Sequence, residues 1–205
     1  ASKIGLKVTK VLSFDQVAGF GDDFVSKNFP NQAENEKAGA VVLLTHSAAG
    51  IKLIKQVRES GFKNEIFGPH TFGSNIFVKD IDEKYTKHTY VCAPFLWELA
   101  NDRASKFSDE YKAKYKETPD LTAPMAYDAV LMLSTALKEK GANREKIRDY
   151  LLSLTWQTAI EGLTGNLFFE KGRTLDRDIF ITEIKDSRFK AAFTQLSIPK
   201  EAYVF

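Results

Sequence analysis

Short apolar runs alternate with longer helical patterns through the first hundred residues. Runs of strand length occur at residues 7–13, 40–44, 65–68 and 89–93. The first is Val-rich and extended in character, the second (AVVLL) is apolar throughout, and each of the last two is followed by a proline. An unbroken apolar run is typical of a strand covered on both faces. We therefore expect four strands here, and we expect the second to be buried on both sides.

Helical patterns separate these runs. Residues 22–28 predict a short helix, and residues 50–60 place three aliphatic side chains on one helical face before Gly61 ends the pattern. Strands that alternate with helices favour a parallel sheet with helices on its faces. The expected fold class is therefore α/β, with a twisted, mostly parallel sheet and flanking helices.

The pattern changes near residue 100, where three helical segments follow one another. They span residues 102–116, 124–140 and 144–153, and the breaks between them contain Thr-Pro and Gly-Ala-Asn. In the second segment, one helical face carries four apolar residues, Ala126, Val130, Leu133 and Leu137. This change, from alternating strand and helix patterns to successive helices near Ala100, is the one candidate domain boundary.

Strand patterns return toward the C-terminus. Residues 166–169 predict one strand, a Lys-Gly turn follows at residues 171–172, and residues 178–184 predict a second strand with alternating isoleucines. The chain contains no internal repeat and no low-complexity segment.

Charge and composition argue against some classes of function. The chain has 29 Lys and Arg against 27 Asp and Glu, which leaves a net charge of +2. Nucleic-acid binding depends on many cationic contacts with phosphates, so we expect no nucleic-acid partner. The longest apolar runs are far shorter than the ~20 residues that span a bilayer. Cys92 is the single cysteine, so an internal disulfide is impossible.

Polar and aromatic residues follow three of the expected strands. In open parallel sheets, ligands bind outside the carboxyl ends of the strands. The loops at residues 45–47, 69–72 and 94–98 supply hydroxyls, two imidazoles and two large aromatic side chains there. This mixture is typical of a small-molecule pocket. The candidate ligand contacts are His46, Ser47, His70 and Thr71, followed by Phe95 and Trp97.

The string THSAAG after the second run also permits an enzymatic interpretation. A hydrolase nucleophile elbow, G-x-S-x-G, places its serine on a strand-to-helix turn, where Ser47 lies. Both glycines of that motif are replaced here, and the only histidines after Ser47 are His70 and His88, which come early for triad partners. A turn of small residues that opens a helix explains the string without catalysis. We expect no enzyme, with a serine hydrolase built on Ser47 as an alternative.

Cofactor and metal motifs are absent from the sequence. The three histidines and Cys92 do not match the ligand spacing of a zinc site. Residues 68–74 have the glycine spacing of a phosphate loop but lack its lysine. We therefore expect no cofactor and no metal.

Three longer strings occur in the order typical of a known family. The chain contains AGAVVLLTHSAAGIKLIKQVRESGFKNEIFGPHTFGSN, which resembles the second lobe of type I periplasmic solute-binding proteins, the branched-chain amino-acid receptor group. Next comes FSDEYKAKYKETPDLTAPMAYDAVLMLSTALKEKGANREKIRDYLLSL, which is similar to the family's F-x-x-x-Y…P…A-Y-D-A-V…A-L signature. The last is GLTGNLFFEKGRTLDRDIFITEI, which is similar to its closing G-x-T-G-x-x-x-F-x-x-x-G segment and the strand after it. Together they cover the chain from about Lys7 to Lys190.

The resemblance implies a binding function. Members of this group capture a small ligand, usually an amino acid or related carboxylate, between two lobes that close about a hinge. The closed form docks on a membrane permease of the ABC class. The implied location is periplasmic or extracellular, with membrane association through the permease or a lipid anchor. Some relatives are instead extracellular sensor domains of larger receptors, which is the alternative role.

The resemblance also implies a domain organisation. Residues 1–99 correspond to the α/β core of the second lobe, residues 100–157 to helices that the family packs on the first lobe, and residues 158–205 to strands that return to the second lobe. The first lobe has no counterpart here, so we expect a fragment of a longer protein or a chain that completes itself through another copy. The unpartnered apolar face of residues 124–140 then favours self-association.

Two histidines depart from the family pattern. His46 falls where relatives often carry an aromatic ligand contact, and His70 falls where amino-acid receptors place an acidic residue against the ligand's ammonium. Histidine offers no fixed negative charge, and protonated histidine attracts anions. This argues against an α-amino acid and for a simple carboxylate. A solvent-facing turn is the alternative role for His70, and hinge packing is the alternative for Phe95 and Trp97.

Overall fold

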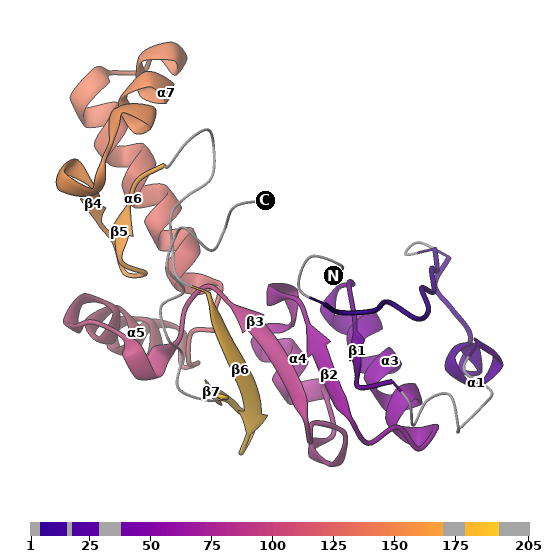
Figure 1. Ribbon diagram of the computed structural model, residues 1–205. Helices are drawn as coiled ribbons and strands as arrows, with labels where there is room; N and C mark the ends of the chain where they lie inside the picture. The colour runs from indigo at the N-terminus through magenta and orange to yellow at the C-terminus, as the bar shows by residue number, and fades with distance from the viewer. Residues whose placement is uncertain (1–4, 16–17, 29–37, 170–178, 193–205) are drawn as a thin grey trace.

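A five-stranded sheet lies at the centre of the computed structural model (Figure 1), which describes residues 5–15, 18–28, 38–169 and 179–192. In spatial order its strands are β1 (Ala40–Val42), β2 (Glu65–Gly68), β3 (Thr89–Ala93), β6 (Phe180–Lys185) and β7 (Arg188–Ala191). β1, β2 and β3 pair in parallel, whereas β6 pairs antiparallel with β3 and β7 antiparallel with β6. The predicted α/β class is confirmed, with a mixed sheet of mainly parallel strands and a last strand, β7, that no pattern predicted.

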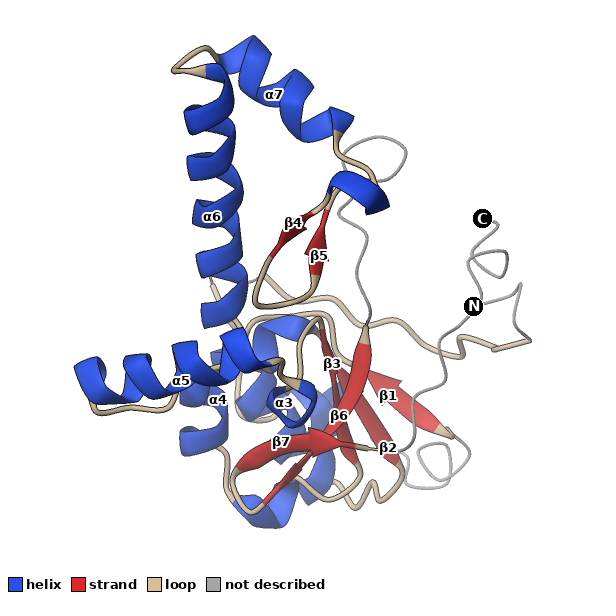
Figure 2. Ribbon diagram, turned by 90° about the vertical axis from the view of Figure 1, so that its left-hand side faces the viewer, coloured by secondary structure: helices blue, strands red, loops and turns tan. Residues whose placement is uncertain are grey.

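Helices α3 (Ser47–Glu59) and α4 (Asn75–Asp80) pack on one face of the sheet (Figure 2). α3 is the helix predicted at residues 50–60, and it ends before Gly61, whose φ of 91° suits glycine. Strands alternate their side chains between two faces, and β3 accordingly buries Thr89, Val91 and Ala93 toward the helices. This sheet, together with α1, α3 and α4, is called the sheet unit below.

Phe72 fills the space between the helices and the sheet. It is fully buried, and its ring stacks on Phe77 with the centroids 4.5 Å apart. A Cβ atom at Gly50 or Gly68 would lie 2.2 Å from the Phe72 ring. Both glycines are therefore required by close packing, because no side chain fits between the ring and the backbone.

The opposite face of the sheet is more open. Val42, Phe67 and Tyr90 lie in one row across β1, β2 and β3, and Phe67 stacks on Tyr90 with ring centroids 5.3 Å apart. Val42 is 65% exposed, and Leu44, just after the strand, is 83% exposed. The prediction that residues 40–44 are buried on both faces is wrong, because β1 lies at the edge of the sheet and this side of it meets solvent.

Residues 7–13, expected to form a strand, lie outside the sheet. The described part of this N-terminal segment forms only one isolated bridge, between Asp15 and Gly19. Val8 and Val11 are largely exposed. An extended segment becomes a strand only when its backbone groups pair with a neighbour, and these residues do not pair with β1. That prediction is therefore wrong.

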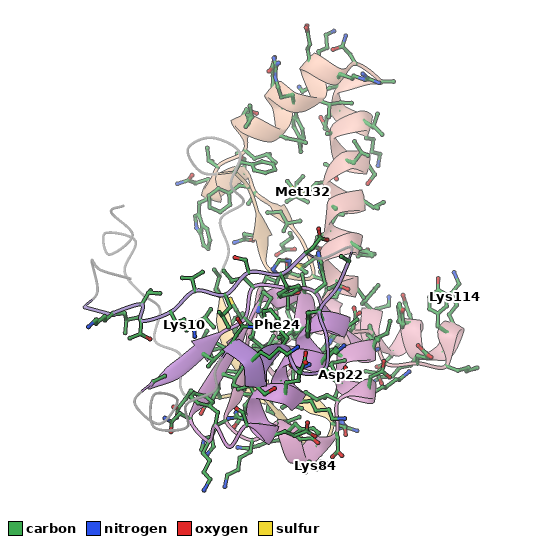
Figure 3. The ribbon with its side chains drawn as sticks, turned by 90° about the vertical axis from the view of Figure 1, so that its right-hand side faces the viewer. Lys10, Asp22, Phe24, Lys84, Lys114 and Met132 are labelled. Carbon is green, nitrogen blue, oxygen red and sulfur yellow. The ribbon has the colours of Figure 1, made fainter. Side chains whose placement is uncertain are left out.

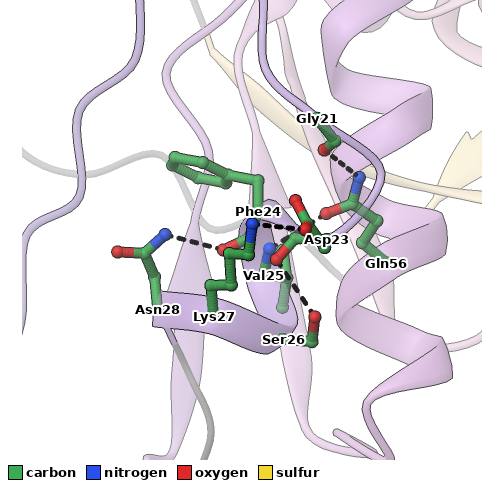
Figure 4. Close-up of polar contacts among 8 residues, drawn as sticks. All are labelled: Gly21, Asp23, Phe24, Val25, Ser26, Lys27, Asn28 and Gln56. Carbon is green, nitrogen blue, oxygen red and sulfur yellow. Dashed lines mark hydrogen bonds and ion pairs between the residues drawn. The ribbon is translucent and has the colours of Figure 1, made fainter.

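The predicted short helix is confirmed as α1 (Phe24–Asn28), which packs on α3 (Figure 4). Gln56 of α3 holds it from both sides. Its side-chain oxygen accepts the Val25 N–H at 3.0 Å, and its amide nitrogen donates to the Gly21 carbonyl at 3.0 Å. Lys52, one turn earlier on α3, donates to the Phe20 carbonyl at 2.8 Å.

A second group of elements projects from the sheet edge and is called the projecting unit below. It consists of α6 (Ala123–Lys140), α7 (Arg144–Ser153) and a hairpin of β4 (Ile160–Glu161) and β5 (Asn166–Leu167). α6 rises away from the sheet, with the hairpin beside it and α7 across its far end (Figures 1 and 2). α5 (Asp102–Tyr115) lies at its base. All three predicted helices are confirmed.

The predicted C-terminal strands have separate locations. The run at residues 166–169 contributes β5 to the hairpin, whereas the run at residues 178–184 contributes β6 to the sheet. The turn predicted at residues 171–172 lies outside the described residues. Short 3-10 helices complete the described part of the chain: η2 (His70–Phe72), η3 (Glu83–Tyr85), η4 (Trp97–Leu99) and η5 (Trp156–Thr158).

α6 carries two stripes of residues, one of which is buried and the other exposed. Its buried stripe is Pro124, Asp128, Met132 and Ala136, spaced four residues apart. Met132 points from α6 toward the hairpin (Figure 3) and joins a small core of Leu154, Leu167 and Phe168. The apolar face predicted from the sequence is also present, but all four of its residues, Ala126, Val130, Leu133 and Leu137, are exposed.

Asp128 ties α6 to the loop of the hairpin. Its Oδ1 accepts the Leu163 N–H at 2.7 Å, and its Oδ2 accepts the Thr164 N–H at 2.9 Å and the Thr164 hydroxyl at 2.6 Å. The side chain is only 1% exposed. A Cβ atom at Gly162 would lie 2.6 Å from Oδ1, so the glycine allows this close approach. The three donors satisfy a carboxylate that would otherwise be costly to bury.

Candidate functional site

Four of the six predicted contacts lie together at the carboxyl ends of β1 and β2. This end of the sheet is called the carboxyl edge, or simply this edge, below. His46 immediately precedes α3 in an extended conformation, with φ −86° and ψ 166°, and Ser47 is the first residue of that helix. His70 and Thr71 lie in η2, just after β2. Both histidines are exposed, whereas Ser47 and Thr71 are half-buried. This arrangement follows from the parallel pairing of β1 and β2, which aligns their carboxyl ends.

Two hydrogen bonds join the loops that carry the histidines. The Ser47 hydroxyl donates to the Thr71 carbonyl at 2.6 Å, and the Thr71 hydroxyl donates to the Thr45 carbonyl at 2.8 Å. The Ser47 oxygen also lies 3.3 Å from the hydroxyl of Ser74, which accepts the Phe77 N–H at the start of α4. Ser47 and Thr71 therefore hold the two loops together, and their hydroxyl protons are already committed.

Phe95 and Trp97 follow β3 at the same edge of the sheet. Phe95 is only 5% exposed and packs with Ala104 of α5 and Leu163 of the hairpin loop. Trp97 is half-buried and lies edge-on to Phe95, with ring centroids 4.9 Å apart. The burial of Phe95 favours the packing role that the sequence left open for it, whereas Trp97 keeps part of its surface accessible.

Two polar groups at this edge are buried, one on Thr45, which sequence reasoning did not single out, and one on the predicted contact Trp97. The Thr45 hydroxyl and the Trp97 indole N–H are buried, and in the described part of the chain neither has a hydrogen-bond partner. Buried polar atoms are nearly always paired, so each of these two groups can take a partner from outside the described part of the chain. No local sequence pattern reveals such a group, because pairing depends on side chains from other elements.

Ser47 lacks the surroundings of a catalytic nucleophile. Such a serine donates its proton to a general base, usually a histidine. The Ser47 proton instead goes to the Thr71 carbonyl, and no hydrogen bond joins Ser47 to a described histidine. His88, at the amino end of β3, lies at the other end of the strands. The geometry therefore gives no support to hydrolysis.

The described regions offer few other groups for metal binding or nucleophilic catalysis. No group of three or more His, Cys, Asp or Glu side chains among the described residues could hold a metal ion. Burial raises the pKa of the Cys92 thiol, which makes this half-buried cysteine a weaker nucleophile at neutral pH. A hollow of about 390 Å³ lies elsewhere, between the start of α5 and the hairpin, and it includes Arg103, Glu161 and Gly165 but none of the predicted contacts.

This architecture occurs in a known family. The family described as "Periplasmic binding protein" matches residues 2–189 of the sequence. The chain belongs to the periplasmic binding protein family. The match confirms the resemblance found in the sequence, and membership in this family indicates a periplasmic or extracellular location. Curated protein sequences contain no significant match to this periplasmic binding protein.

Solved structures of other binding proteins share the fold. The leucine-binding protein LivK of Thermotoga maritima is 19% identical, with a TM-score of 0.77, over 93% of this chain and 52% of that one. LivJ of Streptococcus pneumoniae, in complex with isoleucine, is 25% identical, with a TM-score of 0.66, over 78% and 47%. A solute-binding protein of R. palustris, in complex with benzoate, is 16% identical, with a TM-score of 0.65, over 80% and 47%. This periplasmic binding protein chain thus spans about half the length of each.

None of the described helices of this periplasmic binding protein has both the length and the apolar character needed to cross a membrane.

Proposed function

We propose that this chain is the ligand-binding component, or a part of it, of an ABC-type uptake system for an amino acid or small carboxylate. The observation that carries the proposal is the family match over residues 2–189. The related structures with isoleucine and benzoate support the same class of ligand. In this role the protein holds and releases its ligand unchanged and catalyses no reaction.

In the proposed mechanism, the ligand binds at the carboxyl edge of the sheet. His46 and His70 contact it from the two joined loops, and Trp97 approaches it from the end of β3. Ser47 and Thr71 keep the loops in place, because their hydrogen bonds fix the position of one loop relative to the other. A ligand that bridges this edge and a second lobe favours the closed arrangement, which is a population shift about a hinge.

Calorimetric titration of the full chain with leucine, isoleucine and benzoate tests this proposal. We expect at least one of them to bind and to raise the melting temperature. Replacing both His46 and His70 with Ala should weaken binding by about tenfold or more. The matched control is His88→Asn, which changes an exposed histidine at the other end of β3, at a positive φ of 54° that Asn tolerates. Failure of all three ligands, and of the α-keto acid of leucine as a further small carboxylate, to bind would overturn the proposal.

Two alternative roles make different predictions. An extracellular sensor domain would be encoded with a downstream membrane segment and a signalling domain, which sequencing of the complete gene would reveal. A serine hydrolase would react at Ser47 with a fluorophosphonate probe, and mass spectrometry would locate the label. We expect no labelling, because the Ser47 proton is held by the Thr71 carbonyl.

We also propose two partners. One is an ABC permease, which would bring the protein to the membrane, with or without a lipid anchor. The other is a second copy of this chain, bound through the exposed face of α6. The four exposed residues of that face are spaced four, three and four apart, which is the spacing of a coiled-coil seam: Ala126, Val130, Leu133 and Leu137.

Charge favours an antiparallel pairing of two α6 helices. The segment just before α6 carries Asp120, and the last turn of the helix carries Lys138 and Lys140. A two-fold axis across the seam places Asp120, just before each helix, beside the last turn of the other helix, where Lys138 and Lys140 outnumber Glu139. It also opposes the two helix dipoles favourably. This pairing would cover side chains such as Val130, which is 67% exposed in the single chain.

A further inference from the structure

We propose that the ligand of the carboxyl edge is an organic anion that lacks an ammonium group, such as a monocarboxylate or a keto acid. The inference rests on the proposed binding function and narrows its ligand class. It depends on three features of the edge: its charge, its hydrogen-bond donors and its unpaired buried groups.

None of the three loops that form the edge supplies a carboxylate to pair with a ligand ammonium. The loops at residues 45–49, 69–74 and 94–97 contain no Asp or Glu. Glu98, the residue after Trp97, is turned toward β7, where it accepts the Ala191 N–H at 3.1 Å. Asp120 precedes Leu121, whose N–H donates to the Gly73 carbonyl, but its carboxylate is turned toward the start of α6, where it accepts three donors from Thr122 and Ala123 at 2.7–3.0 Å. An ammonium taken out of water without an opposite charge loses its hydration uncompensated. The neutral oxygens of the loops cannot replace that charge.

The donors at the edge suit an anion. His46 and His70 are exposed, and an imidazole donates at least one N–H and becomes cationic when protonated. They lie directly next to the Ser47–Thr71 hydrogen bond, so the bond fixes the backbone that carries both. His46 makes no side-chain cap on α3, which leaves the positive end of that 13-residue helix at the same edge.

The unpaired buried groups supply an independent observation. Thr45 is 6% exposed, and its hydroxyl has no partner in the described part of the chain. The Trp97 indole N–H is also buried and unpaired there, and an indole can only donate. Two of the three such groups found in the described regions therefore lie at this edge; the third is Nε of Arg58, near the C-terminal end of α3. An acceptor oxygen of a bound carboxylate would satisfy the indole.

The sharpest test compares leucine with the α-keto acid of leucine, which has the same side chain and carboxylate but no ammonium. Calorimetry and melting temperature are measured on the full chain, with benzoate as a second carboxylate. We expect the keto acid or benzoate to bind at least about tenfold more tightly than leucine. We expect His70→Glu to weaken carboxylate binding by about tenfold or more, because it places a negative charge beside the anion, whereas His88→Asn should leave binding unchanged.

The outcomes separate this inference from the proposed function. If leucine binds as tightly as its keto acid, or more tightly, the inference is overturned while the binding function stands. If the carboxylates bind but His70→Glu binds them as well as the unchanged chain, the assignment of the anion to this edge is overturned. If leucine, isoleucine, the keto acid and benzoate all fail to bind, the proposed function itself fails.

Discussion

The sheet unit and the projecting unit bury their apolar residues in different ways. The sheet unit closes a continuous core on one face of the sheet, where Ile54, Ile66, Phe72 and Phe77 are fully buried. The core of the projecting unit is a small cluster around Met132. A large closed core stabilises a unit by itself, whereas a small one depends on ties to its surroundings.

The composition of α6 explains this difference. A surface helix of a globular protein normally has one apolar face and one polar face. α6 has a buried stripe that includes Met132 and a second apolar stripe that includes Val130 and Leu133, both exposed. A helix that is apolar on two sides is suited to contact neighbours on both, so the sequence of the projecting unit encodes a contact that the single chain leaves open.

The largest expected effect lies in the sheet unit. Replacing Phe72 with Ala should lower the free energy of unfolding by about 3–5 kcal/mol, because the cavity would be lined by rigid helix and sheet atoms. Replacing Met132 with Ala in the projecting unit should cost less. Chemical denaturation measures both, with Val42→Ala as an exposed control that should change stability by less than about 0.5 kcal/mol. A larger loss for Met132→Ala would reverse the comparison of the two cores.

The next effect concerns the tie between α6 and the hairpin. Replacing Asp128 with Ala leaves the Leu163 and Thr164 N–H groups without their acceptor and should cost about 3 kcal/mol. Amide exchange of the hairpin should rise more than that of β2 and β3. Glu139→Ala, an exposed carboxylate on the same helix, is the control. Uniform exchange across both units would show that Asp128 does not hold the projecting unit in particular.

A smaller effect on stability, but a clear one on assembly, is expected at the exposed stripe of α6. Sedimentation of the unchanged chain should show a concentration-dependent dimer. Changing Val130 and Leu133 together to Glu should weaken dimerisation at least about tenfold, because charges would enter the seam. The free energy of unfolding of the single chain should change by less than about 1 kcal/mol. Leu152→Glu on α7 is the control. A chain that stays monomeric at every concentration would refute the pairing.

The smallest effect is electrostatic and concerns the attachment of residues 18–28 to α3. A hydrogen bond and ion pair with Lys52 lower the pKa of the Asp22 carboxyl. The interaction therefore stabilises the folded state at pH values above about 3.9, which is the pKa of Asp in the unfolded chain. This stabilisation is lost as the pH falls through the lower pKa that Asp22 has in the folded state. Amide exchange of α1 should therefore be faster in Asp22→Asn than in the unchanged chain at neutral pH.

The same pair offers an internal control through solvent conditions. Both side chains are substantially exposed, so high salt should screen their attraction and reduce the difference between the two proteins. The difference should also vanish when the pH falls below the folded-state pKa of Asp22. A difference that persists at low pH would point to a cause other than this ion pair.

Much of the fold could be predicted from the sequence because the signals are local. The periodicity of α3, α5, α6 and α7 and the short apolar runs of β2 and β3 depend on neighbouring residues alone. His46 and His70 could be assigned to one edge for a similar reason, since the loops that follow parallel strands meet at the same end of a sheet. Three strings of the sequence were sufficient to indicate the family that the match over residues 2–189 confirms.

Only the tertiary structure decided which of these elements pair, and which side chains are free to act. Residues 7–13 and 40–44 have similar strand character, yet only the second group enters the sheet, because pairing requires a backbone partner far away in the sequence. Ser47 and Thr71 looked like ligand contacts, but their protons are committed to carbonyls of the neighbouring loop. Local patterns determine what a segment can form, whereas distant contacts determine which of its groups remain available to a ligand.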